Sequence, residues 1–277
     1  MRGEMTVERW LLLNQEKLEP AVNMAIDEKL TDWHRAGQIP PILRFYGWAP
    51  AGLSVGYFQR TKGKIDVEAV QKHGFEMVRR PTGGQAVLHD DELTYSFVIS
   101  EEHEAIPKTI KAAHKLISEA LLVGLAKLDI EASFAIPEEK QTGSGTAICF
   151  EEPSWYEITM QDRKIIGSAQ GRHQGILLQH GSIPLHMNAT ELFDLFVFEN
   201  ARVKERMLRA FGGKASGILD LIGREIPLDE MKKAFQDGFA QVFDVAFEEF
   251  TLSDAQWDEI HALAANKFRQ ESYLFSR

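Results

Sequence analysis

Apolar side chains recur every three or four positions in several long segments, which is the spacing of one face of an α-helix. Pro20 opens the first segment and Gly37 follows its end, while a second segment covers 108–128. A third begins at Pro227, and 257–268 repeats the same spacing near the end of the chain. Because an apolar helix face needs a surface to pack on, this pattern predicts helices packed on a sheet.

Shorter segments between these helices have the character of β-strands. The segment 75–80 alternates apolar and polar residues, as a half-buried strand does. Segments 155–160 and 164–170 predict a hairpin that turns at 161–162. Further strands are expected at 8–13, 42–46, 53–57, 93–100 and 175–185. The predicted fold class is therefore α+β, a mixed β-sheet with packed helices, in one domain over 1–277 whose portion from about 188 to 277 is helical.

Composition narrows the class of protein. The 277 residues are 44% hydrophobic and 26% charged, which is typical of a globular chain with ample material for a core. We expect no membrane partner, because no apolar run approaches the roughly 18 residues of a membrane span, and no apolar signal segment begins the chain. The single cysteine excludes internal disulfides and cysteine-based metal clusters, which favours a cytoplasmic location. A net charge of −10 disfavours nucleic acid as a partner.

The most unusual stretch is 79–90, where an arginine pair is followed by a Gly-Gly turn and a His-Asp pair. Gly83 and Gly84 allow a positive φ and a close approach of the backbone to a ligand. The strands on either side would present these polar groups together at one end of a sheet. A hairpin connection with ordinary surface charges is the alternative interpretation.

Cys149 is the only thiol of the chain. A lone cysteine is often a small buried hydrophobic residue, but Cys149 follows a polar segment, 138–146, that predicts a mobile loop. An ordinary thiol has a pKa of about 8.5, and a cation that lowered it by about 1.5 units would stabilise the thiolate by roughly 2 kcal/mol. Lys164 is the candidate cation, because the small residues at 167–169 leave room for a ligand. The alternative is a solvated hairpin lysine.

Two histidines, His89 and His180, offer further polar groups. A cysteine with a histidine could form a papain-type dyad, but the flanking signature of those proteases is absent. The phosphate-loop pattern and the paired spacing of zinc ligands are absent too, so the sequence predicts no metal site.

Three motifs occur in order along the chain. They are 79–84 with Val87 and His89-Asp90, then Lys164 with 167–170, and then 179–182. Together they resemble the signatures of the lipoate- and biotin-protein ligase superfamily, and the resemblance extends over about residues 8–250. The superfamily's catalytic domain has a fold similar to that of class II aminoacyl-tRNA synthetases, and this fold is what the resemblance implies.

Within that superfamily, the segment 149–157 is most similar to the cysteine-dependent octanoyltransferases of Gram-positive bacteria. The resemblance implies that Cys149 is the acyl-thioester nucleophile and that Lys164 lowers its pKa. It also implies substrate-binding roles for residues of the three motifs: Arg79, Arg80, Thr82, Gly83, Gly84, His89, Gly167, Ser168, Ala169, His180 and Gly181. We therefore expect the 79–84 loop, Lys164 and His180 to surround one pocket.

The reaction implied is transfer of octanoyl from octanoyl-acyl carrier protein to a lysine of a lipoyl-domain protein, such as the glycine cleavage H protein, in endogenous lipoate biosynthesis. It would need no ATP and no metal. Because both partners are usually acidic, a local basic rim is expected from Arg79, Arg80, Arg163 and Arg172.

Three alternatives stay open at this point. They are an ATP-dependent lipoate-protein ligase, an octanoyl amidotransferase acting between lipoyl domains, and an inactive lipoyl-domain-binding protein. Gln85 argues against the first, because many ATP-dependent ligases have a third glycine there.

Overall fold

An eight-stranded sheet forms the centre of the molecule in the computed structural model, which describes residues 7–135 and 157–277. Across the sheet the strands are β11 (Val245–Glu249), β1 (Glu8–Leu18), β2 (Ile42–Trp48), β6 (Glu92–Ser100), β10 (Ile176–Pro184), β9 (Arg163–His173), β8 (Ile158–Met160) and β7 (Ser133–Phe134). Strand β1 runs parallel to both of its neighbours, and the other neighbouring pairs are antiparallel. The predicted mixed sheet is confirmed.

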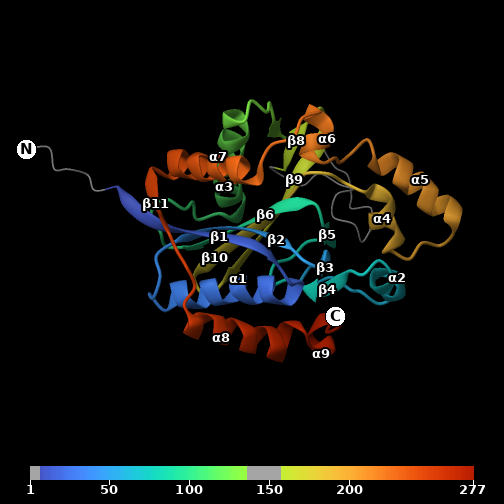
Figure 1. Ribbon diagram of the computed structural model, residues 1–277, viewed down its shortest axis with the longest axis horizontal. Coiled ribbons are helices and arrows are strands. Elements are labelled where there is room, and N and C mark those ends of the chain that lie inside the picture. The colour runs from blue at the N-terminus through green and yellow to red at the C-terminus, as the bar shows by residue number, and fades with distance from the viewer. Residues whose placement is uncertain (1–6, 136–156) are drawn as a thin grey trace, which may run out of the picture.

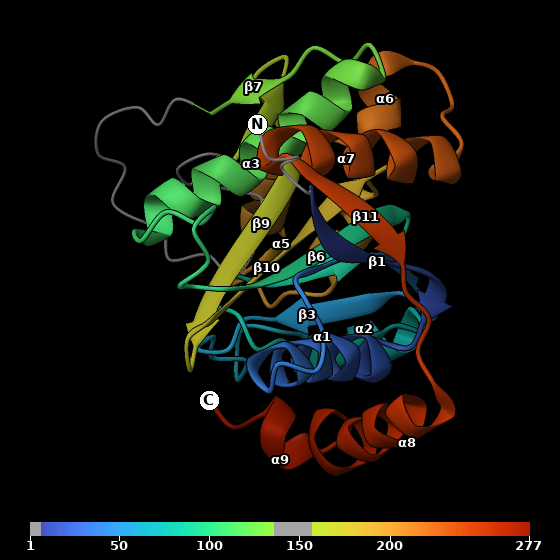
Figure 2. The ribbon, with the colours of Figure 1, turned by 90° about the vertical axis from the view of Figure 1, so that its left-hand side faces the viewer.

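Helices cover both faces of this sheet (Figures 1 and 2). Helix α1 (Pro20–Arg35) lies on one face, and α8 (Asp254–Leu263) with a π-helical turn (Ala264–Phe268) packs on α1. Helices α3 (Ile110–Lys127) and α7 (Leu228–Phe243) pack together and cover the other face. All four predicted amphipathic segments are thus helical. Within the described residues, no helix has both the length and the apolar character to cross a membrane.

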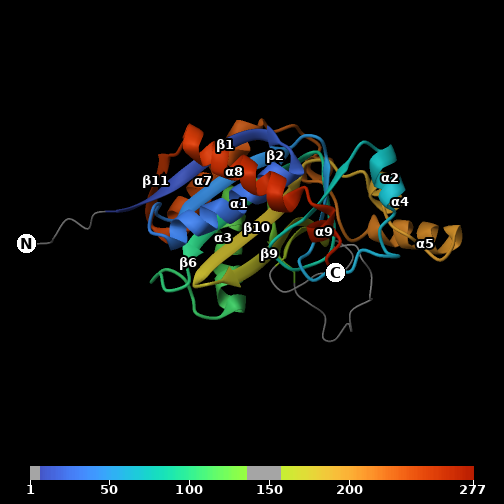
Figure 3. The same ribbon diagram turned by 90° about the horizontal axis from the view of Figure 1, so that it is seen from below.

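A second, three-stranded sheet stands beside the first and carries the signature loop. Its order is β4 (Glu76–Arg79), β3 (Gly52–Val55) and β5 (Val87–His89), and the loop joins β4 to β5. Helices α2 (Val67–Lys72), α4 (Ala189–Asp194) and α5 (Ala201–Phe211) lie at this end of the molecule (Figure 3). The expectation that the strands at 75–80 and 93–100 share one sheet is therefore wrong, because the short strand β5 intervenes and β6 joins the larger sheet.

The end of the chain is helical in α6 (Ile218–Ile222), α7, α8 and α9 (Glu271–Leu274). One element departs from the predicted helical portion, because Val245–Glu249 forms β11 and extends the large sheet beside β1. The hairpin prediction is confirmed, since Gln161 and Asp162 have φ values of 51° and 59°, as a two-residue turn of type I′ requires. Cys149 and the segment 138–146 lie outside the described residues.

Candidate functional site

The first arginine of the signature loop is buried and holds backbone. Its Nη1 donates hydrogen bonds to the carbonyl oxygens of Gly56, Tyr57 and Gln59 at 2.6, 3.1 and 3.0 Å. Its Nε and Nη2 both donate to the carbonyl oxygen of Leu274, at 2.9 and 2.7 Å. Because the Arg79 side chain is 0% exposed, the predicted basic rim is wrong for this residue.

Arg80 organises the Gly-Gly turn from the inside. Its guanidinium donates to the carbonyl oxygens of Gly83 at 2.7 Å and Gln85 at 2.8 Å, and also contacts the hydroxyl of Ser54 at 3.1 Å. Gly84 has a φ of +94°, and a Cβ there would lie 2.8 Å from Arg80 Nη2. The rim prediction is wrong for Arg80 too, because this buried cation shapes the turn.

A hydroxyl, an imidazole and a carboxylate form a relay between the loop and the large sheet. Thr82 Oγ1 lies 2.6 Å from His180 Nε2, and His180 Nδ1 lies 3.1 Å from Asp27 Oδ2. Burial lowers the pKa of His180, in spite of Asp27, so the ring is neutral at pH 7. The proton therefore sits on Nδ1, facing the carboxylate, and Nε2 accepts from Thr82. The predicted meeting of the first and third motifs is confirmed.

Asp27 is held in turn by a buried ion pair. Its Oδ1 lies 2.7 Å from Arg44 Nη1, and both side chains are fully buried. Ser96 and Tyr46 donate hydrogen bonds to the same carboxylate. Burial by itself would raise the pKa of Asp27, but Arg44, His180 and Ser96 outweigh it and lower the pKa. The carboxylate is therefore ionised at neutral pH and orients the His180 ring.

His89 belongs to a separate buried network. Its Nε2 lies 2.8 Å from Ser54 Oγ, and its Nδ1 lies 2.8 Å from Glu92 Oε1. The ring stacks on Trp48 with centroids 4.1 Å apart, and Ser182 donates to the other oxygen of Glu92 at 2.5 Å. Both ring nitrogens are thus engaged inside the protein, and Ser54 links this network to Arg80.

Lys164 stands at the start of β9, away from the relay. Its Nζ lies 2.5 Å from Glu157 Oε1, and the two side chains are 3% and 5% exposed. His180 pairs with Ala169 across the sheet, so five residues separate Lys164 from that position, about 17 Å along a strand. The structure brings Thr82 and His180 together and places Lys164 in a second buried cluster. That Lys164 and the signature loop contact one shared substrate stays a prediction.

The small residues of the second and third motifs have differing surroundings. A Cβ on Gly181 would lie 2.6 Å from a ring carbon of Tyr95 and 2.7 Å from the carbonyl oxygen of Gly167. The space beside Gly181 is therefore filled by Tyr95, whose hydroxyl lies 2.8 Å from Ser168 Oγ. Gly167, Ser168 and Ala169 are half-buried, so this part of β9 keeps some exposed surface among the described residues.

A cavity of about 660 Å³ lies against the signature loop. It is bounded by α1, the 57–58 turn, the end of the β9–β10 hairpin, Lys267 in the π-helical turn and Tyr273 in α9. Thr82, Gly83 and Gly171 line it, and Lys164 is not among the described residues that do. Its volume falls within the roughly 300–1,000 Å³ of small-molecule sites.

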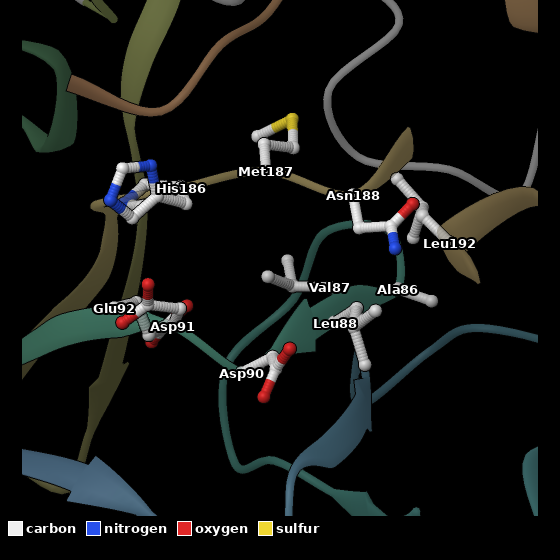
Figure 4. Close-up of a pocket in the computed structure, with 11 residues that line it drawn as sticks. Ala86, Val87, Leu88, Asp90, Asp91, Glu92, His186, Met187, Asn188 and Leu192 are labelled. Carbon is white, nitrogen blue, oxygen red and sulfur yellow. The ribbon is translucent and has the colours of Figure 1, made fainter. Parts of the chain in front are cut away.

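A second cavity, of about 40 Å³, lies between β5 and the segment after β10 (Figure 4). Asp90, Asp91 and His186 border it. Burial and the neighbouring Asp91 raise the pKa of Asp90, while a hydrogen bond to Asp220 raises the pKa of His186. A space of this size holds little more than water, so the larger cavity is the better candidate for a substrate.

Comparison with known proteins assigns the family. A family model, the lipoyl protein ligase A/B catalytic domain, matches residues 19–240. The chain is 46% identical to octanoyltransferase LipM of Bacillus subtilis (strain 168), over 99% of this chain and 100% of that protein. It is 45% identical to octanoyltransferase LipM of Anoxybacillus flavithermus, with the same coverage. The chain belongs to the LipM octanoyltransferase family. It is therefore an acyltransferase, and the resemblance seen in the motifs is confirmed.

Solved structures confirm the fold of this LipM family member. A bipartite lipoate protein ligase from Thermoplasma acidophilum superposes with a TM-score of 0.80 at 23% identity, covering 98% of this chain and 97% of that one. A lipoate-protein ligase A bound with ATP superposes with a TM-score of 0.75 at 25% identity, covering 98% and 99%. The catalytic-domain fold implied by the resemblance is thus the fold observed.

Four charged residues around these clusters were not singled out from the sequence: Asp27, Arg44, Glu92 and Glu157. For Asp27 a signal existed, because a carboxylate beside Ile26 falls within the apolar stripe of the first helix. A charge on the buried face of a helix needs a partner. Glu157 and Glu92 carry no such signal, because acidic residues at strand ends are usually solvated.

Replacing Arg44 with methionine is expected to destabilise the protein by roughly 3–5 kcal/mol at about pH 7.5, because Asp27 would stay buried without its cation. In the native protein the lowered pKa makes ionised Asp27 stabilising above its unfolded pKa, and this contribution is lost as the pH falls through its folded pKa. In Arg44→Met burial instead raises that pKa, so the penalty should shrink towards about pH 5. Urea unfolding at both pH values measures this.

The control is the double variant Arg44→Met with Asp27→Leu, which removes both charges and should regain much of the lost stability. A double variant less stable than Arg44→Met alone would contradict the assigned pairing.

Proposed function

We propose that this acyltransferase takes octanoyl from octanoyl-acyl carrier protein onto Cys149 and passes it to a lysine of a lipoyl-domain protein, such as the glycine cleavage H protein. The observation that carries the proposal is the buried ion pair between the Lys164 ammonium and Glu157. Both residues come shortly after Cys149 in the sequence. Full-length similarity to proteins named octanoyltransferase supports the acyl group.

The first half-reaction exchanges one thioester for another. The Cys149 thiolate attacks the thioester carbonyl, a tetrahedral oxyanion forms, and the carrier protein leaves as its free thiol after taking a proton. Because the bond broken and the bond formed are of the same kind, the step needs neither ATP nor a metal. One oxyanion donor is typically worth about 3 kcal/mol, and the Lys164 ammonium is a candidate donor.

The acyl chain itself supplies binding energy. Burial of each CH₂ contributes about 0.8 kcal/mol, so six methylenes give roughly 5 kcal/mol. The cavity beside Thr82 and Gly83 has ample volume for such a chain. Its wall includes the apolar side chains of Phe58, Ile176 and Leu178. A chain longer or shorter by one methylene would change binding about tenfold or less.

The second half-reaction transfers the acyl group to an amine. The acceptor lysine must be neutral to attack, and the Cys149 thiolate is the leaving group. The acceptor nitrogen gains the acyl group and loses a proton, which leaves an amide. An amide is more stable than a thioester, so this step drives the sequence forward.

The test is incubation with octanoyl-acyl carrier protein without nucleotide, followed by mass spectrometry of the intact protein. We expect a mass increase of one octanoyl group on Cys149, which disappears when a lipoyl-domain acceptor is added. A mass increase that requires ATP would favour a lipoate-protein ligase, the activity named for a structural neighbour. Acylation from an octanoylated lipoyl domain alone would favour an amidotransferase, and no acylation from any donor would favour a binding protein.

A further inference from the structure

The last helix of the chain is joined to the signature loop by a continuous series of contacts. Leu274 in α9 accepts both hydrogen bonds described above from Arg79, and α9 packs beside β4 (Figure 1). The same guanidinium holds the carbonyl oxygens of Gly56, Tyr57 and Gln59. Arg79 is thus a bridge between α9 and the turn after β3.

That turn in turn supports the loop. The Tyr57 amide donates to the Thr82 carbonyl oxygen at 2.8 Å. A Cβ on Gly56 would lie 2.0 Å from the carbonyl oxygen of Gly84, so the turn and the loop are in direct backbone contact. A shift of the turn would therefore displace Thr82 and Gly84.

The helix also forms part of the large cavity. Tyr273 lines it together with Tyr57, Phe58 and Thr82. The Tyr273 hydroxyl is buried and has no hydrogen-bond partner among the described residues, and burial raises its pKa. Because this oxygen exposes almost no surface, Tyr273 borders the cavity through its other atoms.

We infer that α9 is a positioning element of the active site: the Leu274 carbonyl oxygen holds the signature loop in place through Arg79, and this loop borders the cavity that takes the acyl donor. This inference rests on the proposed function. The donor is an acylated thiol on a pantetheine arm, which carries amide carbonyls next to an apolar chain. The cavity offers such a molecule both kinds of contact, with apolar side chains such as Leu178 and charged ones such as Arg35 and Lys267.

Two shortened chains separate the positioning role from general stability. A chain that ends at Gln270 loses the acceptor for Arg79, whereas a chain that ends at Leu274 keeps it as a carboxylate, a stronger acceptor. We expect the first to raise the KM for octanoyl-acyl carrier protein about tenfold, with a smaller change in kcat. The chain ending at Leu274 should behave like the full chain.

Hydrogen exchange gives a readout that needs no substrate. The Tyr57 amide should exchange faster in the chain ending at Gln270 than in the full chain or the chain ending at Leu274. Equal exchange in all three would overturn the positioning role. This measurement involves no acyl transfer, so it decides the positioning role by itself. Failure of the full chain to form an acyl-enzyme would refute the proposed function and would leave the exchange result unaffected.

Discussion

Cys149→Ala and Cys149→Ser are expected to abolish octanoyl transfer and the covalent acyl-enzyme while the protein stays folded. The thiol carries the acyl group in the proposed reaction, and alanine offers no nucleophile. A serine hydroxyl has a far higher pKa than a thiol, so it remains protonated without a dedicated base. The measurement combines intact mass after exposure to octanoyl-acyl carrier protein with amide formation on a lipoyl-domain acceptor.

The matched control is thermal unfolding of the same two variants, which should resemble that of the native protein. The variants should also still bind the octanoylated carrier protein, because binding precedes the chemistry. Transfer by Cys149→Ala at the native rate would show that the thiol is not the acyl carrier, and the proposed mechanism would have to be abandoned.

Local signals in the sequence predicted the local elements well. The apolar stripe and Pro20 indicated α1, and the polar pair at 161–162 indicated the turn between β8 and β9. These features depend on residues close together in the chain, where periodicity and turn chemistry decide the outcome. The resemblance of three ordered motifs then led to the fold, which the family model and the solved structures confirm.

Partners far apart in the chain could not be predicted in the same way. The arginine pair suggested a basic rim, yet Arg79 reaches Leu274, which lies at the other end of the sequence. An arginine that binds a surface anion and one that binds buried carbonyl oxygens look alike in a sequence. Only the three-dimensional contacts distinguish them, because the guanidinium serves both purposes with the same donors.

Pairing across the hairpin of β8 and β9 also changes what Lys164 can do for the proposed thiolate. Glu157 balances its charge at 2.5 Å, and two opposite charges so close act together as a dipole. A cation lowers a thiol pKa through its field, and a carboxylate raises it. Lys164 and Glu157 should therefore shift the pKa of Cys149 in opposite directions, a feature that neither residue reveals in the sequence.

Lys164→Ala is accordingly expected to raise the pKa of Cys149, so that alkylation by iodoacetamide slows at neutral pH and recovers at higher pH. Octanoyl transfer should fall about 10²- to 10³-fold, the usual loss when one oxyanion donor is removed. Glu157→Gln should lower the pKa of Cys149 and speed its alkylation at neutral pH, because the Lys164 charge is no longer balanced.

The decisive measurement is the alkylation rate of Cys149 against pH in the native protein and these two variants, with Cys149→Ala as the blank. Lys164→Arg is the matched control for charge, because guanidinium keeps the cation but changes its size and shape. It should retain much of the thiol reactivity and less of the transfer rate. Identical pH profiles in the native protein and Lys164→Ala would show that the buried pair does not act on the thiol. Opposite shifts of the Cys149 pKa in Lys164→Ala and Glu157→Gln would establish an electrostatic role, because loss of packing cannot produce shifts of opposite sign.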